Sequence, residues 1–201
     1  SVSSSSQSTQ ADGSALQSPV TPLPQSAEAM SAPLAALLPR VVPNFRGLLK
    51  VERLSGGASQ ETYRIEIETD QGHAALAMRR AAGGVEGELS EQHPGLLAEA
   101  TLMRVAKQHG VPEPEVYHVL EPADGLGAGF IMQWLDGVTL GAKIVKAPEL
   151  DEVRPRLAFL CGEILARIHQ IDLASSGLDQ LLQDLSPEQY VRQTWERYQL
   201  L

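Results

Sequence analysis

The chain has 201 residues, which suits one domain with an appendage, and its formal net charge is −9. The negative balance argues against a nucleic-acid binder or a protein of anionic membrane surfaces, because both depend on basic patches. Hydrophobic residues make up 43% of the chain, an ordinary share for a globular protein, and no apolar run reaches the roughly 18 residues that span a bilayer.

The first 32 residues are predicted to form a disordered tail. Their opening stretch is rich in Ser, Gln and Pro and has almost no large apolar side chains, so burial cannot offset the entropy lost on ordering. The tail lacks the basic start and apolar stretch of a secretory signal, and it has no arginine for a mitochondrial presequence. Cytoplasmic location is therefore the default expectation.

Three strands follow in close succession from Lys50. The pattern KVERL is followed by a Gly-containing loop and then by Tyr63, Ile65 and Ile67, which alternate with charged residues. This period of two indicates a strand with one buried face. A turn at residues 70–72 leads into HAALAMRR, a third strand. Short turns between consecutive strands predict an antiparallel meander.

After the third strand, the sequence predicts a helix, two strands and two further helices. The spacing predicts a helix over residues 96–108, a strand in EVYHVL and a strand in FIMQWL, whose nearly continuous apolar run suits burial on both faces. After residues 136–137 the chain should loop into a helix over RLAFLCGEILARIH, where Cys161 is predicted to be a small core residue. Ser186 and Pro187 predict the start of a final amphipathic helix.

The loop before the second strand holds Gly56, Gly57 and Ser59. Glycines allow backbone N–H groups to approach a polyphosphate closely, and the serine adds a hydroxyl donor. A pair of glycines is more often only a hairpin turn, so the loop by itself leaves both interpretations open.

Ala77 and Arg79 strengthen the phosphate hypothesis. Side chains two apart in a strand project from one face, so a small residue that admits adenine would stand beside a cation that reaches the α- and β-phosphates. Glu99 borders the buried face of the following helix and could hold the Arg79 guanidinium bidentately. The alternatives are an exposed arginine pair that ends an edge strand, and a solvated glutamate that suits the helix dipole.

The last candidate segment is the end of the fifth strand: Met132, Gln133, Trp134 and Leu135. An extended segment between two lobes can hold adenine through backbone groups while apolar side chains enclose the ring. A buried core strand is compatible with the same residues. No spacing of His, Cys and carboxylate residues predicts a metal site in this chain.

With these residues in view, the chain resembles the aminoglycoside phosphotransferase family, in the branch related to kinase-like domains beside acyl-CoA dehydrogenases. The matching stretches are LSGGASQETYRI, LAMRR, AEATLMRVAKQHGVPEPEVY, GFIMQWLDGVTL, LARIHQIDLASSGL and YVRQTWERY. The resemblance implies an α+β fold, with a protein-kinase-like N-lobe (a five-stranded antiparallel sheet plus one helix) over residues 33–135. Residues 136–201 would form the hinge and the first helices of an incomplete C-lobe.

The resemblance also assigns roles. Gly56, Gly57 and Ser59 would form a phosphate flap, Arg79 the phosphate-pairing cation with Glu99 as its partner, and residues 133–135 the adenine hinge. Arg79 stands where many relatives have lysine, and Gln60 where asparagine is common. The cofactors would be ATP and Mg²⁺, and the second substrate a small molecule with a hydroxyl group.

The family's His-Gly-Asp catalytic loop and its metal-binding aspartate do not occur in this sequence. We therefore expect them after Leu201, with no catalytic residue in this chain and no activity of residues 1–201 alone. The alternative is a non-catalytic kinase-like module that binds nucleotide or a partner protein.

Overall fold

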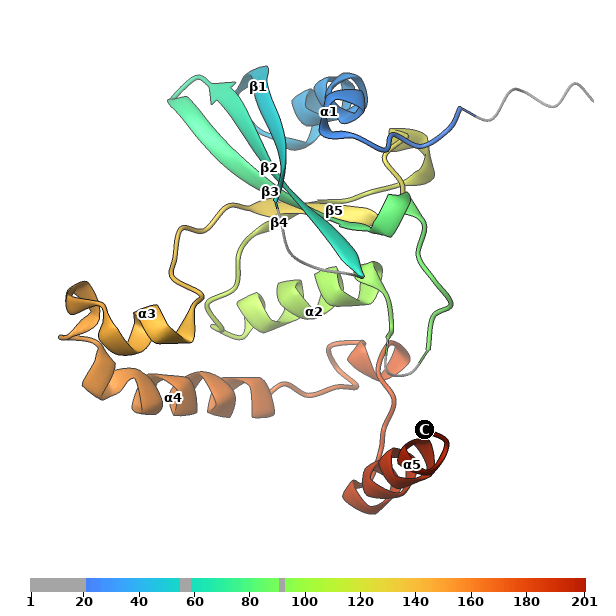
Figure 1. Cartoon of the computed structure of the whole chain (residues 1–201), viewed down its shortest axis with the longest axis vertical. Coiled ribbons are helices and arrows are strands. Elements are labelled where there is room, and N and C mark those ends of the chain that lie inside the picture. The colour runs from blue at the N-terminus through green and yellow to red at the C-terminus, as the bar shows by residue number, and fades with distance from the viewer. Residues whose placement is uncertain (1–20, 55–58, 91–92) are drawn as a thin grey trace, which may run out of the picture.

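The computed structural model describes residues 21–54, 59–90 and 93–201. Figure 1 shows a twisted sheet with a helix on either face and further helices below it. The helices and strands are α1 (Ala27–Val41), β1 (Phe45–Leu54), β2 (Gln60–Thr69), β3 (Gly72–Ala81), α2 (Leu96–Gln108), β4 (Val116–Val119), β5 (Gly129–Gln133), α3 (Gly141–Lys146), α4 (Leu157–His169) and α5 (Pro187–Gln199).

The five strands form one antiparallel sheet in the order β1-β2-β3-β5-β4. The predicted meander of β1, β2 and β3 is confirmed, and so are the α+β class and the helix inserted after the third strand. In this order β3 lies between β2 and β5 rather than at an edge of the sheet. The interpretation of its two arginines as the end of an edge strand is therefore wrong.

Helix α1 covers the upper face of the sheet in Figure 1. The alternate residues Tyr63, Ile65 and Ile67 of β2 are buried there, as predicted, and they pack against a helix whose buried residues are Met30, Leu34, Leu37 and Leu38. The sequence pattern did not predict this helix, which contains Pro33 and Pro39.

Helix α1 also corrects the predicted boundary of the tail at residue 32. The Ser26 side chain accepts a hydrogen bond from the Ala29 N–H at 3.1 Å, so the helix begins at Ala27. Residues 1–20 lie outside the described part of the chain.

Helix α2 covers part of the opposite face. Leu96 and Ala100 on the helix pack with Phe130 on β5 and Val116 on β4. Phe130 and its neighbour Ile131 belong to different clusters, because adjacent residues of a strand point to opposite faces. Burial of β5 on both faces is confirmed.

A buried ion pair fastens the sheet to its surrounding loops. Arg80 is fully buried and donates to Glu61 at 2.8 Å, to the Leu126 carbonyl at 2.6 Å and to the Pro24 carbonyl at 2.8 Å. Glu61 also accepts from the Tyr63 hydroxyl at 2.9 Å. Burial alone would raise the pKa of Glu61, but the Gly83 N–H, Arg80 and Tyr63 outweigh it and lower that pKa.

Helices α3, α4 and α5 lie below the sheet in Figure 1. The predicted helices at 156–169 and after Ser186 are both present, but none of the residues of α4 or α5 is buried. Cys161 is exposed, so its predicted core position is wrong: in the described structure no element packs over its side of α4. Within the described ranges, no helix is long and apolar enough to cross a membrane.

Candidate functional site

The candidate site lies on the α2 side of the sheet, where Ala77 and Arg79 project together from β3. Ala77 is buried and faces Arg64 on β2 and Met132 on β5 in the strand register. Arg79 is two residues further and opposes Phe130. The structure therefore places a small side chain, a cation and an apolar wall side by side, as the alternation of a strand requires.

Arg79 forms an ion pair with Glu99 through its Nη1 atom. Glu99 lies in the first turn of α2, and its backbone N–H makes the first helical bond to the Gly95 carbonyl at 3.1 Å. The two side chains are 36% and 30% exposed, so the pair borders solvent rather than the deep core. The expected contact is present, and neither side chain is the solvated group of the alternative interpretation.

Two arginines on this face have a buried donor without a partner. In the described structure the Nε atoms of Arg64 and Arg79 are inaccessible to solvent and make no hydrogen bond. A buried donor left unpaired costs roughly 1–3 kcal/mol, so such groups usually meet a ligand, an ion or water. The face is therefore suited to an anionic ligand.

The sequence pattern did not single out Arg64, which alternates with the buried face of β2 like the other charged residues of that strand. The Arg64 guanidinium lies over the Trp134 ring, 5.0 Å from its centroid, and Arg64 Nη2 is 3.6 Å from Glu66 Oε1. The position of Arg64 in the sheet shows that it belongs to the candidate site. It shares a face with Thr62 and, across the β2–β3 register, with Ala77. Only the pairing of strands reveals that neighbourhood.

The predicted adenine hinge is the segment that leaves β5. Met132 is partly buried beside the α2 cluster, whereas Leu135 is 56% exposed. The Gln133 N–H donates to the Glu115 carbonyl at 2.7 Å, and the Gln133 side-chain oxygen accepts from the Glu115 N–H at 3.2 Å. The backbone N–H and the side chain of Gln133 are therefore both committed to Glu115.

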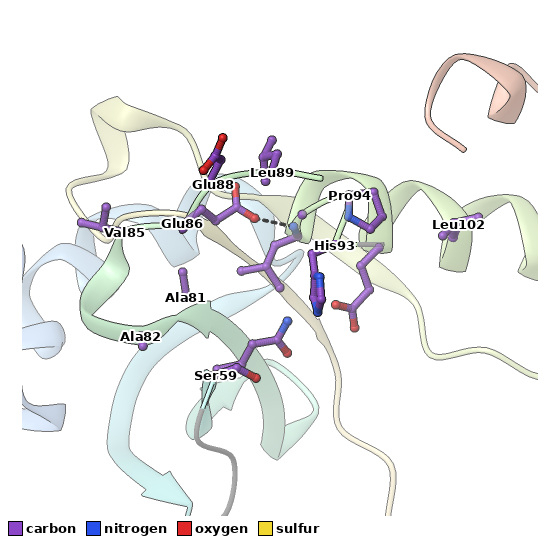
Figure 2. Close-up of a pocket in the computed structure, with 15 residues that line it drawn as sticks. Ser59, Ala81, Ala82, Val85, Glu86, Glu88, Leu89, His93, Pro94 and Leu102 are labelled. Carbon is purple, nitrogen blue, oxygen red and sulfur yellow. Dashed lines mark hydrogen bonds between the residues drawn. The ribbon is translucent and has the colours of Figure 1, made fainter. Parts of the chain in front are cut away.

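Gly56 and Gly57 lie outside the described residues, but Ser59 is described and is exposed directly before β2. Ser59 lines a cavity of about 580 Å³ between β2, the end of β3 and α2, shown in Figure 2. Glu99 lines the same cavity. The structure therefore brings the base of the predicted flap and the partner of Arg79 to one hollow.

No group of three or more His, Cys, Asp or Glu side chains that could hold a metal ion occurs within residues 21–54, 59–90 and 93–201. Glu99 is engaged by the Arg79 guanidinium.

Comparison with known proteins decides the family. A family model described as "Phosphotransferase enzyme family" matches residues 50–201. The chain belongs to the phosphotransferase enzyme family. The match extends from β1 through α5, so it includes Arg79, Glu99 and the end of β5. The resemblance inferred from the sequence motifs is confirmed, and transferase chemistry is the general activity of the family.

A curated relative supports the same branch. The mouse (Mus musculus) protein "Acyl-CoA dehydrogenase family member 10" is 27% identical over 158 residues, which cover 75% of this chain and 14% of that protein. The chain thus corresponds to a small part of the relative's length.

Proposed function

We propose that this chain forms the ATP-binding lobe of a phosphotransferase that transfers the γ-phosphoryl group of ATP to a hydroxyl of a small molecule. The observation that carries the proposal is the arrangement on the α2 side of the sheet. Arg79 pairs with Glu99, has a buried Nε donor without a partner, and projects from β3 on the same face as the small Ala77. The chain that holds this arrangement belongs to a phosphotransferase family.

Each residue has a role that follows from its position. Ala77 leaves room for the flat adenine, and Met132 provides an apolar surface beside it. Arg79 pairs with the α- and β-phosphates, while Glu99 fixes the direction of its guanidinium. Ser59, with Gly56 and Gly57 in the loop before it, donates to the phosphates as the flap.

ATP, when bound with Mg²⁺, supplies the phosphoryl group and the charge neutralisation that its transfer needs. The chain's own residues bind and orient the nucleotide in this proposal, and we assign no catalytic base and no Mg²⁺ ligand to them. We propose that the protein works in the cytoplasm, a compartment that supplies ATP.

The decisive experiment is a calorimetric titration of the 201-residue chain with ATP in the presence of Mg²⁺. Replacing Arg79 with Ala should weaken binding about 10- to 100-fold, because it removes charge-assisted hydrogen bonds to phosphate. Arg79→Lys should retain more affinity, since it keeps the charge but loses the fork.

The matched control is Arg46→Ala. Arg46 lies near the start of β1 and pairs with Asp70. The ATP affinity of this variant should equal that of the wild type. Saturable ATP binding that is equally strong in the Arg79→Ala and Arg46→Ala variants would refute the role of Arg79.

A second function has one observation in its favour. The outer surface of α5 exposes Tyr190, Val191, Trp195 and Tyr198 by more than half, and the rings of Trp195 and Tyr198 stack at 5.5 Å. Exposed apolar groups of this kind often mark interaction surfaces. A non-catalytic module that binds a partner protein would lose that partner on removal of residues 186–201, whereas its ATP affinity would stay unchanged.

A further inference from the structure

Helix α2 begins without a capping side chain of its own. Its N-cap residue is Gly95, which has no side chain to accept a hydrogen bond from the first turn. The Glu86 carboxylate replaces it from nine residues earlier in the chain: Glu86 Oε1 accepts from the Leu96 N–H at 2.5 Å. In Figure 2 this bond is the dashed line from Glu86 to the start of α2.

The contact between this loop and the helix is close. A Cβ atom built on Gly95 would lie 2.9 Å from Glu86 Oε1 and 2.8 Å from Leu89 Cδ2, and Gly95 has a φ of +93°. Glu86 is partly buried, whereas Glu88, two residues further, is exposed. The glycine therefore lets one carboxylate of the loop come directly against the helix end.

The capped turn is the one that carries Glu99. Leu96 opens the helix, and Glu99 makes its first backbone bond to Gly95. A carboxylate at this end also interacts favourably with the helix dipole, so Glu86 stabilises the turn through both a hydrogen bond and charge. Fraying of the turn would move Glu99 away from Arg79.

We propose that Glu86 is a positioning residue that aligns Glu99, and through Glu99 the Arg79 guanidinium. The inference rests on the proposed function for its effect on ATP, but not for its effect on the ion pair. Glu86 does not touch the nucleotide in this proposal. It acts by holding the first turn of α2 in the conformation that pairs Glu99 with Arg79.

The test is a double-mutant cycle read by NMR on the 201-residue chain. Glu86→Ala should increase hydrogen exchange about fivefold at the amides of Leu96 and Glu99, which are hydrogen-bonded in the first turn, and this is the size of a lost helix cap of about 1 kcal/mol. It should also shift the Arg79 Nε–H resonance. In a Glu99→Ala background, Glu86→Ala should leave that resonance unchanged, since the group through which it acts is absent.

Two variants sharpen the comparison. Glu86→Gln keeps an acceptor oxygen and should restore most of the exchange protection, and Glu88→Ala should behave as the wild type. Unchanged exchange at the amides of Leu96 and Glu99 in Glu86→Ala would overturn the proposal. An equal shift of the Arg79 resonance in both backgrounds would do so as well, because Glu86 would then act on Arg79 without Glu99.

ATP titrations of the same variants separate this inference from the proposed function. Glu86→Ala should weaken ATP binding about threefold in the wild-type background and have no further effect beside Glu99→Ala. If the wild type binds no ATP, the proposed function fails, while the NMR cycle still decides whether Glu86 positions Glu99.

Discussion

At the scale of single residues, the adjacent arginines of β3 have opposite environments. Arg79 borders solvent on the α2 side and pairs with Glu99, whereas Arg80 is fully buried on the α1 side and pairs with Glu61. Adjacent strand residues point to opposite faces, so one dipeptide serves a candidate binding surface and a structural network. In the β2–β3 register, Glu61 on β2 lies directly opposite Arg80 on β3.

Replacing Arg80 with Met should destabilise the protein by about 3–5 kcal/mol, because Glu61 would remain buried without its cation. Replacing exposed Lys50 with Met, which removes a surface pair with Glu52 at 2.8 Å, should change the stability far less, because solvent screens exposed charges. Urea denaturation of both variants measures the difference. Similar losses for the two would show that the buried pair has no special weight.

The double variant Arg80→Met/Glu61→Leu should recover much of the stability lost by Arg80→Met alone. Removing both charges abolishes the unpaired buried carboxylate, and apolar replacements of a buried pair are often well tolerated. A double variant less stable than Arg80→Met would show that Glu61 stabilises the sheet mainly through Tyr63 and Gly83.

At the scale of elements, α2 is the helix whose start depends most on its surroundings. The amphipathic pattern predicted its bounds of 96–108, and these are confirmed. The means of capping was not predictable from local sequence, because Glu86 is separated from the helix by a long loop. Helix α4 shows the reverse case: its apolar spacing predicted the helix, yet the structure leaves its residues unburied.

Gly95→Ala should destabilise the protein more than Gly72→Ala. Both glycines have a positive φ, so each alanine suffers backbone strain of roughly 1–2 kcal/mol. Only at Gly95 does the new Cβ also meet neighbours closer than 3 Å, whereas nothing lies within 4 Å of the same position at Gly72. The difference between the thermal stabilities of the two variants measures the steric part of the loss. Equal losses would mean that the loop around Glu86 yields freely.

At the scale of the whole molecule, the sheet separates two faces with different tasks. One face is covered by α1 around the larger apolar cluster, and the other is covered in part by α2 and leaves the side chains of Arg79 and Arg64 partly exposed. A second polar network joins α1 to the end of the sheet. Asp124 accepts from Arg40 at 3.1 Å, from the Glu121 N–H at 2.8 Å and lies 2.8 Å from His118 Nε2.

These two networks predict acid sensitivity of the whole fold. Burial by itself raises the pKa of Asp124, but the Glu121 N–H, His118 and Arg40 outweigh it and lower that pKa; the pKa of Glu61 is lowered as well. A carboxyl whose folded pKa is depressed stabilises the fold above its ordinary pKa, and that contribution is lost as the pH falls.

Urea denaturation at a series of pH values should therefore show a free energy of unfolding that declines from about pH 4.5 downward. The variant Glu61→Gln/Asp124→Asn should be less stable at pH 7 and should lose less stability on acidification than the wild type. Parallel pH profiles for the two proteins would contradict this assignment.

The sequence by itself predicted the strands, the position of α2 and the family, and through the family resemblance it predicted the pairing of Arg79 with Glu99. These depend on local periodicity and on motifs that carry their own spacing. Tertiary structure alone decided the burial of Arg80, the place of Arg64 over Trp134, the cap that Glu86 gives to α2 and the exposure of Cys161. The physical reason is distance along the chain: strand register and loop packing join residues that no local pattern relates, and whether an apolar face is covered depends on what packs against it.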